Sequence, residues 1–167
     1  MLPLTQDQIR SSFLNASRSE IKAITFPADF AQLRWEELDY LGWRDPKMPQ
    51  RGYLVFPADD GTITSAILRA PEGGSGKLRK VLCDLCRDVR CEVEVYLYVA
   101  RRAGAAGRAG NTLGTLICAD FQCSANLRVP VPQSQRRGDW EQTREHNLEG
   151  LRHRTARFMA AIRGNEG

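Results

Sequence analysis

Two close pairs of cysteines constrain the fold of this chain more than any other feature of its sequence. Two residues separate Cys83 from Cys86, and after 31 intervening residues Cys118 and Cys123 follow with four residues between them. Paired cysteines of this kind are typical of a tetrahedral zinc site, because one tight turn aims two thiolates at an ion and a distant pair completes the tetrahedron. We therefore predict one zinc ion bound by Cys83, Cys86, Cys118 and Cys123.

Two other interpretations of the cysteines are open. Buried cysteines can serve as small apolar residues, and a Cys-x-x-Cys sequence can be a redox pair. A redox pair is expected at a helix start after a strand, whereas Cys83 follows a basic, glycine-rich approach and a second cysteine pair is present. The fifth cysteine, Cys91, lies five residues after Cys86 on the way into a predicted strand. We expect Cys91 to pack there without binding metal.

Length and composition indicate a globular protein of one domain. The chain has 167 residues, of which 42% are hydrophobic and 26% charged, so it can bury a core. It has no run of about 18 apolar residues, and early polar residues argue against a signal peptide. An odd number of cysteines without a secretion signal indicates the reducing cytoplasm. The net charge of +4 is compatible with an RNA or an acidic protein partner.

Helices are predicted at both ends of the chain. Residues 5–22 contain two capping boxes, which begin at Thr5 and Ser17, so this helix is expected to break and restart. A short helix is expected from residue 30 to about residue 38. A long helix capped by Asp139 is expected to reach about residue 163. Its apolar stripe comprises Leu148, Leu151, Thr155, Phe158 and Ile162, and its other face holds Arg144, His146, Arg152, His153, Arg154 and Arg157.

Four strands are predicted between these helices. Residues 52–57 and 62–68 flank an Asp-Gly turn and should form a β-hairpin. Residues 92–100 alternate with period two, and residues 112–117 return as a strand into the second cysteine pair. The connection 101–111 is rich in glycine and alanine and is predicted to be a long loop without structure of its own. Three aromatic residues are expected to pack the N-terminal helices onto the sheet: Trp35, Tyr40 and Trp43.

The order of these elements is that of a treble-clef zinc finger. A knuckle holds the first cysteine pair, a β-hairpin follows, and a helix to about Leu127 carries the second pair at its N-terminal end, near Asp120. The expected fold is therefore α+β, with an antiparallel sheet, N- and C-terminal helices and a treble-clef-like four-cysteine zinc finger. Four thiolates fill the coordination sphere and leave no position for water, so the zinc is expected to be structural.

We expect a single domain over residues 1–167. Its parts are a helical N-terminal part with a β-hairpin (1–70), a zinc-finger subdomain (78–127) and a C-terminal helix (139–163). The glycine-rich residues 71–77 indicate a flexible connection. Because structural zinc contributes roughly 10–16 kcal/mol of apparent binding energy, the zinc-finger subdomain is expected to need its metal to fold.

No catalytic pattern accompanies the cysteines. The two histidines, His146 and His153, both lie among arginines on the predicted C-terminal helix. The sequence contains no nucleophile elbow, no zinc-protease motif and no dinucleotide-binding fingerprint. We therefore expect neither an enzyme nor a small-molecule substrate, and no association with a membrane.

Three stretches of the chain resemble one known family. They are residues 38–46, the knuckle 83–86 and residues 100–120, where Ala-Arg-Arg-Ala-Gly leads through Asn-Thr-Leu-Gly-Thr to Ile-Cys-Ala-Asp. These stretches are similar to the FBP domain, the C-terminal treble-clef zinc-finger domain of elongation factor G-binding proteins, which include the FusB-type fusidic-acid resistance proteins. The resemblance spans nearly the whole chain.

The resemblance implies a protein that binds translation elongation factor G and helps to release it from the ribosome. The zinc finger would hold the binding surface in shape. The resistance proteins differ in two respects: they carry an extra N-terminal helical bundle, which we expect this chain to lack, and their second ligand pair includes a histidine. We expect the arginine-bearing connection to form part of the contact with the factor, through Arg101, Arg102, Arg108 and Asn111.

Two other functions remain open. The same arginines, with those of the C-terminal helix, would suit a zinc module that binds the ribosome or RNA through phosphates. A redox sensor built on Cys83 and Cys86 is a third class. A steep loss of affinity for RNA with increasing salt would indicate the RNA-binding function.

Overall fold

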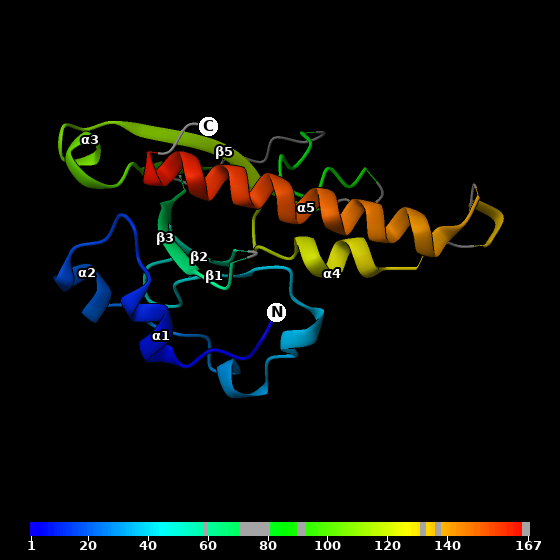
Figure 1. The fold of residues 1–167 in the computed structure, drawn as a ribbon, viewed down its shortest axis with the longest axis horizontal. Helices are drawn as coiled ribbons and strands as arrows, with labels where there is room; N and C mark the ends of the chain where they lie inside the picture. Colours follow the sequence, from blue (N-terminus) through cyan, green and yellow to red (C-terminus); the bar gives the residue numbers. More distant parts are fainter. Residues whose placement is uncertain (59, 71–80, 90–92, 131–132, 136–137, 165–167) are drawn as a thin grey trace.

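One antiparallel sheet of five strands organises the fold, and its strands lie in the order β1-β2-β3-β4-β5 (Figure 1). The computed structural model describes residues 1–58, 60–70, 81–89, 93–130, 133–135 and 138–164. The strands are β1 (Leu41–Arg44), β2 (Arg51–Pro57), β3 (Ile63–Arg69), β4 (Val95–Arg101) and β5 (Thr112–Cys118). The sheet, the helices around it and the four clustered cysteines confirm the predicted α+β fold class.

The helices occur at both ends of the chain and within the β4–β5 connection. They are α1 (Gln6–Ser11), α2 (Arg18–Lys22), α3 (Gly104–Arg108), α4 (Cys123–Arg128) and α5 (Trp140–Arg163), with 3₁₀ turns η1 (Phe30–Gln32), η2 (Trp35–Glu37) and η3 (Gln133–Gln135). No helix in the described part of the chain is long and apolar enough to cross a membrane.

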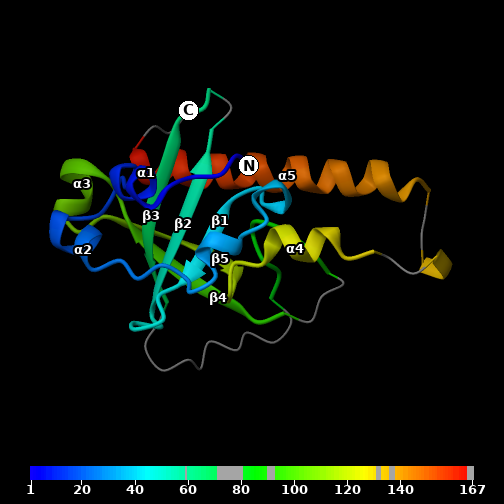
Figure 2. The ribbon, with the colours of Figure 1, turned by 90° about the horizontal axis from the view of Figure 1, so that it is seen from below.

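Alternate residues of β2 enter two separate cores, because successive side chains of a strand point to opposite faces. Tyr53 and Val55 pack with the N-terminal part, where Ile9 is fully buried. Leu54 and Phe56 pack with the cysteines and with the apolar stripe of α5. Figure 2 accordingly shows α1 in front of β3, with α5 passing behind β2 and β3.

The N-terminal helices begin where the sequence predicts. Thr5 caps α1 and Ser17 caps α2, and each forms a complete capping box with the residue three positions later. The predicted helix over residues 30–38 is instead two 3₁₀ turns, η1 and η2. Leu33 has an extended backbone between them, so Phe30 and Trp35 both reach the same core with ring centroids 5.6 Å apart.

Tyr40 differs from the other two aromatic residues expected to pack the N-terminal helices onto the sheet. Trp35 and Trp43 lie in the N-terminal core, as predicted. Tyr40 is also buried, but it packs on the opposite side with the four cysteines, so this part of the prediction is wrong. The reason is β1, which the sequence analysis missed: this edge strand pairs with β2 and alternates its neighbours between the two faces.

The connection between β4 and β5 has structure of its own, which corrects the predicted structureless loop. It contains α3, and its ends meet where the Arg102 N–H donates to the Asn111 carbonyl over 3.0 Å. The Ala103 N–H donates to the carbonyl of Ile162 at 2.7 Å, so this connection satisfies one of the free carbonyls at the C-terminal end of α5. Glycine is required at position 107 because the backbone of Arg102 approaches it closely. A Cβ atom there would lie 1.7 Å from the Arg102 carbonyl oxygen.

The C-terminal helix follows the prediction, with Asp139 capping α5 and the expected apolar stripe buried. The shorter α4 begins only at Cys123, so Asp120 lies in an exposed turn and not at the start of a helix. Phe121 has a φ of 59° in this turn, a conformation that cannot continue a helix. Cys91 and residues 71–77 lie outside the described residues, so the expectations for them stay predictions.

Candidate functional site

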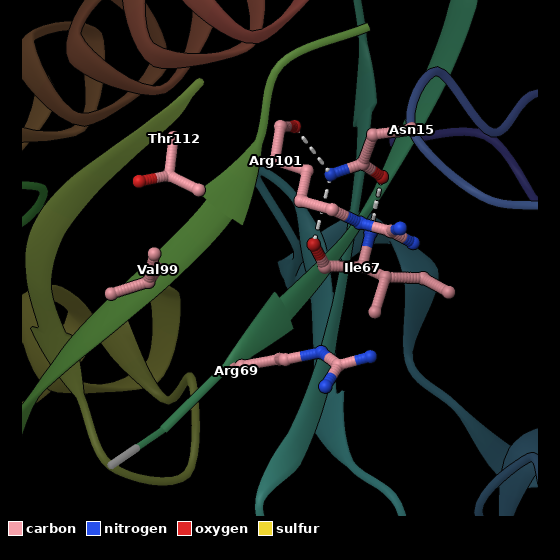
Figure 3. A pocket seen from close by; sticks show the side chains of 6 residues that line it. All are labelled: Asn15, Ile67, Arg69, Val99, Arg101 and Thr112. Atoms are coloured by element: carbon pink, nitrogen blue, oxygen red, sulfur yellow. Dashed lines mark hydrogen bonds between the residues drawn. The ribbon is translucent and has the colours of Figure 1, made fainter. Parts of the chain in front are cut away.

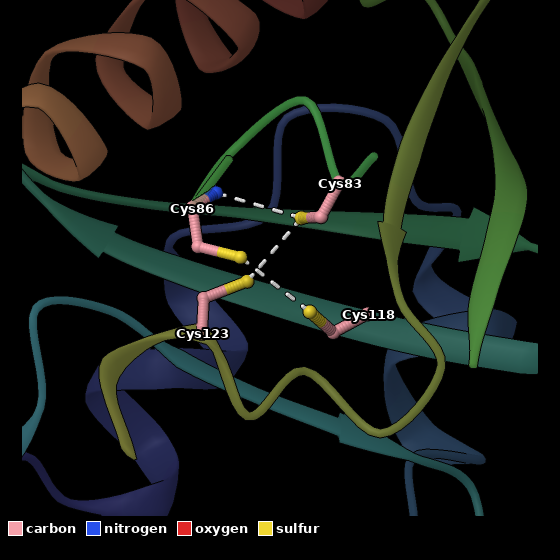
Figure 4. A group of neighbouring side chains, drawn as sticks. All are labelled: Cys83, Cys86, Cys118 and Cys123. Atoms are coloured by element: carbon pink, nitrogen blue, oxygen red, sulfur yellow. Dashed lines mark hydrogen bonds between the residues drawn. The ribbon is translucent and has the colours of Figure 1, made fainter. Parts of the chain in front are cut away.

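The four cysteines of the two pairs meet at one buried point, although they come from separate parts of the chain (Figure 4). Cys83 and Cys86 belong to the turn 83–86, Cys118 ends β5, and Cys123 begins α4. All four Sγ atoms lie within 4.8 Å of one another and point inward. The fold therefore brings together the four residues predicted as metal ligands.

The spacing of the sulfurs fits a tetrahedral metal ion. The Sγ atoms of Cys83 and Cys123 are 3.6 Å apart, and those of Cys86 and Cys118 are 3.7 Å apart. These distances are far longer than the roughly 2.05 Å of a disulfide. They agree with the ~3.8 Å between two sulfurs that each lie about 2.3 Å from one tetrahedral zinc ion. Four soft thiolates, with no oxygen ligand among the described residues of the cluster, are a donor set that suits zinc.

The close approach of the four thiols perturbs their pKa values in opposite directions. Hydrogen bonds from the Cys118 and Cys123 thiols hold the pKa of Cys83 far below its usual range. The same close contacts raise the pKa of Cys123 well above its usual value. Four sulfurs this close cannot all be ionised by themselves, whereas a divalent ion at their centre stabilises the thiolate form of each.

Polar groups around the sulfurs are placed to donate hydrogen bonds to thiolates. The Asn126 side chain donates to Cys118 Sγ over 3.6 Å, and the Cys86 backbone N–H donates to Cys83 Sγ over 3.5 Å. The Tyr40 hydroxyl is buried and has no hydrogen-bond partner among the described residues. Burial and the adjacent Cys123 sulfur raise the pKa of Tyr40, so its hydroxyl keeps the proton that it can donate to a metal-bound thiolate.

Two side chains that the sequence analysis did not single out for this role fix the first cysteine pair. Asp84 accepts hydrogen bonds from the Leu116 N–H at 2.8 Å and the Thr115 hydroxyl at 3.1 Å, which joins the knuckle to β5. Arg154 donates through Nε to the carbonyl of Leu85 at 2.6 Å, which joins the knuckle to α5. The sequence signal for Asp84 is its position inside the Cys-x-x-Cys unit. Arg154 gave no such signal, because its partner is a backbone carbonyl.

A pair of glycines shapes the turn that carries the second cysteine pair. Phe121 lies between Cys118 and Cys123 in the sequence. Its side chain packs against Gly42 of β1 and Gly52 of β2. A Cβ atom on either glycine would come within 2.6 Å of Phe121. The two glycines therefore let the turn approach the sheet closely enough to place both sulfurs at the site.

The residues predicted to contact a partner lie at the other end of the β4–β5 hairpin. Val95 pairs with Cys118 at the metal end, and Arg101 pairs with Thr112 at the far end, about 20 Å away for a strand of this length. Arg101, Arg102 and Arg108 line one cavity of about 280 Å³, whereas Asn111 is exposed beside α3. The structure thus groups three of the four residues and leaves Asn111 outside the cavity.

The arginines of α5 do not all face solvent. Arg152 donates to the buried carboxylate of Asp39 at 3.1 Å and to Glu145 at 2.7 Å. Arg154 is used by the knuckle, as described above. Arg157 and the two histidines are exposed.

Comparison with known proteins places these features in a family. Residues 8–162 match the family described as FBP C-terminal treble-clef zinc-finger. Six chains of solved structures match, and one of these is the structure of the fusidic acid resistance protein FusC, at 21% identity and a TM-score of 0.47. That alignment covers 66% of this chain and 52% of the FusC chain, so this chain spans about half of FusC. The search of curated proteins gave no match.

Proposed function

The chain belongs to the FBP C-terminal treble-clef zinc-finger family, and from this premise we propose that it binds translation elongation factor G and helps to release it from the ribosome. The observation that carries the proposal is the family match over residues 8–162, which includes the sheet, the cysteine cluster and α5. In this proposal the protein works by binding and not by catalysis. Its place would be the cytoplasm, where elongation factor G acts.

The zinc ion has a structural role in this proposal. The four buried cysteines are positioned to bind one metal ion, and we assign Cys83, Cys86, Cys118 and Cys123 as its ligands. A closed tetrahedron of thiolates leaves no position for substrate or water, so the metal supplies cross-linking and no reaction chemistry. It would tie the knuckle, the end of β5 and the start of α4 to one point.

We place the factor-binding surface at the α3 end of the β4–β5 hairpin. Arg101 and Arg108 are exposed there, and Arg102 is half-buried. Backbone hydrogen bonds to Asn111 and Ile162 hold the connection in place, so its arginines are presented by an ordered element. Ordered presentation supports binding, because less conformational entropy is lost when the complex forms.

A binding and release experiment tests this function. Purified elongation factor G should be retained by the immobilised protein in stoichiometric amount. When ribosomes carrying the factor are sedimented, added protein should move the factor from the pellet to the supernatant. Retention without movement would limit the function to binding, and an absence of retention would contradict the proposal.

RNA binding is the second candidate, and the structure gives it less support than the sequence did. Arg152 and Arg154 make contacts inside the fold, so α5 offers fewer cations to phosphates than the sequence indicated. Binding to ribosomal RNA alone, with an affinity that falls steeply with salt, would favour this candidate over the factor.

A further inference from the structure

The sheet is open at the junction between β3 and β4, where the side chain of Asn15 bridges the two strands. The two strands share a single register pair, Arg69 with Val99. Beyond that pair Asn15 lies between them, and Figure 3 shows its amide joined to both strands. Its Nδ2 donates to the carbonyls of Ile67 at 3.0 Å and Arg101 at 2.9 Å, and its Oδ1 accepts from the Ile67 N–H at 2.9 Å.

Two cavities of about 280 Å³ each adjoin Asn15, and both are lined by Asn15 and Arg101. We call the pair the arginine groove, because its described lining includes four arginines and no acidic residue: Arg69, Arg101, Arg102 and Arg108. In the cavity that Arg102 and Arg108 line, Ala16, Gly104 and Gly107 contribute little or no side chain, which leaves space beside the guanidinium groups.

Among the residues that the structure describes, the carboxylate of Glu20 pairs with two arginines of the arginine groove, Arg101 and Arg69. Arg101 donates to both oxygens of Glu20, at 2.8 and 2.9 Å, and Arg69 lies 3.7 Å from the same carboxylate. The Glu20 side chain is only 16% exposed, whereas those of Arg101 and Arg69 are 47% and 63% exposed. Glu20 therefore neutralises part of the charge of Arg101 and Arg69, while both guanidinium groups remain partly exposed to solvent.

We propose that the arginine groove binds a carboxylate-bearing segment of a protein partner, and that Glu20 competes with this segment for Arg101 and Arg69. The partner rests on the proposed function, in which it is elongation factor G. Glu20 then sets the affinity, because a partner carboxylate gains only the part of the arginine charge that Glu20 does not already neutralise.

The groove favours a protein carboxylate over a nucleic acid for two reasons. The contact of Glu20 with Arg101 shows that a carboxylate fits this guanidinium at hydrogen-bond distance. No aromatic side chain is among the residues that line either cavity, so the described lining offers no surface on which a base could stack. Each cavity is also of a size to receive one or two side chains.

Glu20→Gln isolates the charge of Glu20 from its structural role. Glu20 occupies the third position of α2 and completes the capping box by accepting from the Ser17 N–H at 2.8 Å. Glutamine serves equally well at this position of a capping box, so the variant removes the charge and keeps the helix start. Glu37→Gln is the matched control, because it makes the same charge change at a partly exposed residue whose ion-pair partner, Arg34, does not line the groove.

Calorimetry with elongation factor G provides the test. Glu20→Gln should bind the factor at least about threefold more tightly than the parent, whereas Glu37→Gln should stay within about twofold. Arg69→Ala and Arg108→Ala should each weaken binding at least about threefold, with Arg34→Ala as the control for loss of one positive charge. Equal affinities for Glu20→Gln and Glu37→Gln, or for the groove variants and Arg34→Ala, would overturn the proposal.

A second probe separates this inference from the proposed function. An oligoglutamate peptide is titrated into the protein and followed by NMR, beside a single-stranded RNA of equal charge. Shifts caused by the peptide at Asn15, Arg69 and Arg101 support the groove even if the parent fails to bind the factor, a failure that would remove only the proposed partner. Shifts caused by the RNA alone, or by neither probe, would overturn the groove as a carboxylate site.

Discussion

Phe121 shows how single residues set the geometry of the metal centre. Its φ of 59° is uncommon for a residue with a side chain and costs of order 1–3 kcal/mol. Burial of its ring offsets that cost, since Phe121 is 5% exposed and packs on Tyr98 with ring centroids 4.7 Å apart. The strained turn is therefore stabilised by tertiary contacts, which local sequence does not reveal.

Gly42→Ala tests this dependence. The new Cβ would lie 2.6 Å from Phe121 Cβ, so the turn must move away from the sheet. We expect a loss of about 1–3 kcal/mol in the free energy of unfolding, together with weaker zinc retention against a chelator. Gly114→Ala is the control, because the nearest atom to its Cβ would be the flexible end of Leu97 at 3.1 Å, and the nearest backbone atom would be at an ordinary contact distance of 3.7 Å. Equal effects of the two substitutions in urea denaturation would contradict this role for Phe121.

Cys118→Ser tests the assignment of the metal ligands. Among the described residues the cluster contains no fifth ligand, so the variant should lose zinc and unfold the region around β5 and α4. Metal analysis of the parent should give one zinc per chain, and the variant should give well below half an equivalent. Cys91→Ala should retain its zinc, and a loss of metal from that variant would show that Cys91 is a ligand.

At the scale of elements, the turn between β1 and β2 is organised by one buried carboxylate. Asp45 is 1% exposed and accepts hydrogen bonds from the Tyr53 hydroxyl at 2.6 Å and from the N–H groups of Lys47 and Met48 at 2.8 and 3.1 Å. Burial alone would raise the pKa of Asp45, but these hydrogen bonds outweigh it and lower the pKa below the usual 3.8. The ionised form is therefore the one that stabilises the turn.

The direction of this pKa shift fixes how stability depends on pH. A carboxyl group with a lowered pKa in the folded state stabilises the protein above its unfolded pKa, and this contribution is lost as pH falls through the folded value. Asp45→Asn should lower the free energy of unfolding by about 1.5–3 kcal/mol at pH 7 and by much less below about pH 3. Urea denaturation at the two pH values measures this, with the exposed Asp29→Asn as control. If the loss in free energy of unfolding caused by Asp45→Asn were the same at both pH values, the ionised Asp45 would not be what stabilises the turn.

Local signals and tertiary contacts explain which elements could be predicted. Capping residues and periodicity were enough for α1, α2, α5 and the β2–β3 hairpin, because these signals act within a few residues. The strand β1 escaped prediction because it is short, and its pairing with β2 is what makes it a strand. The helix α3 escaped because its end is fixed through Ala103 by α5, a contact about 60 residues away in sequence.

At the scale of the whole molecule, a buried ionic cluster joins three distant parts of the chain. Asp39 precedes β1, and its carboxylate, 3% exposed, accepts from Arg128 of α4 at 2.6 Å and from Arg152 of α5 at 3.1 Å. Its backbone N–H donates to the hydroxyl of Ser124 at 3.0 Å. The sequence predicted the cysteine cluster from spacing alone, but no local pattern could pair Asp39 with arginines 89 and 113 residues away.

Asp39→Ala should destabilise the fold, because it removes the carboxylate that pairs with Arg128 and one of the two carboxylates that pair with Arg152. We expect a loss of about 3 kcal/mol in the free energy of unfolding. Glu37→Ala breaks the exposed pair with Arg34 and should cost less than about 1 kcal/mol. Denaturation curves of both variants at low and moderate salt measure the difference, and a cost for Asp39→Ala as small as that for Glu37→Ala would contradict the joining role.

Isothermal titration calorimetry of the protein with purified elongation factor G tests the central claim most directly. We expect saturable binding by the parent, and at least about tenfold weaker binding when Arg101, Arg102 and Arg108 are replaced together by alanine, with zinc content and thermal stability maintained. Tenfold corresponds to about 1.4 kcal/mol of binding free energy. Equal affinities of parent and triple variant would remove the α3 surface from the contact, and no binding by the zinc-loaded parent would contradict the assignment of elongation factor G as the partner.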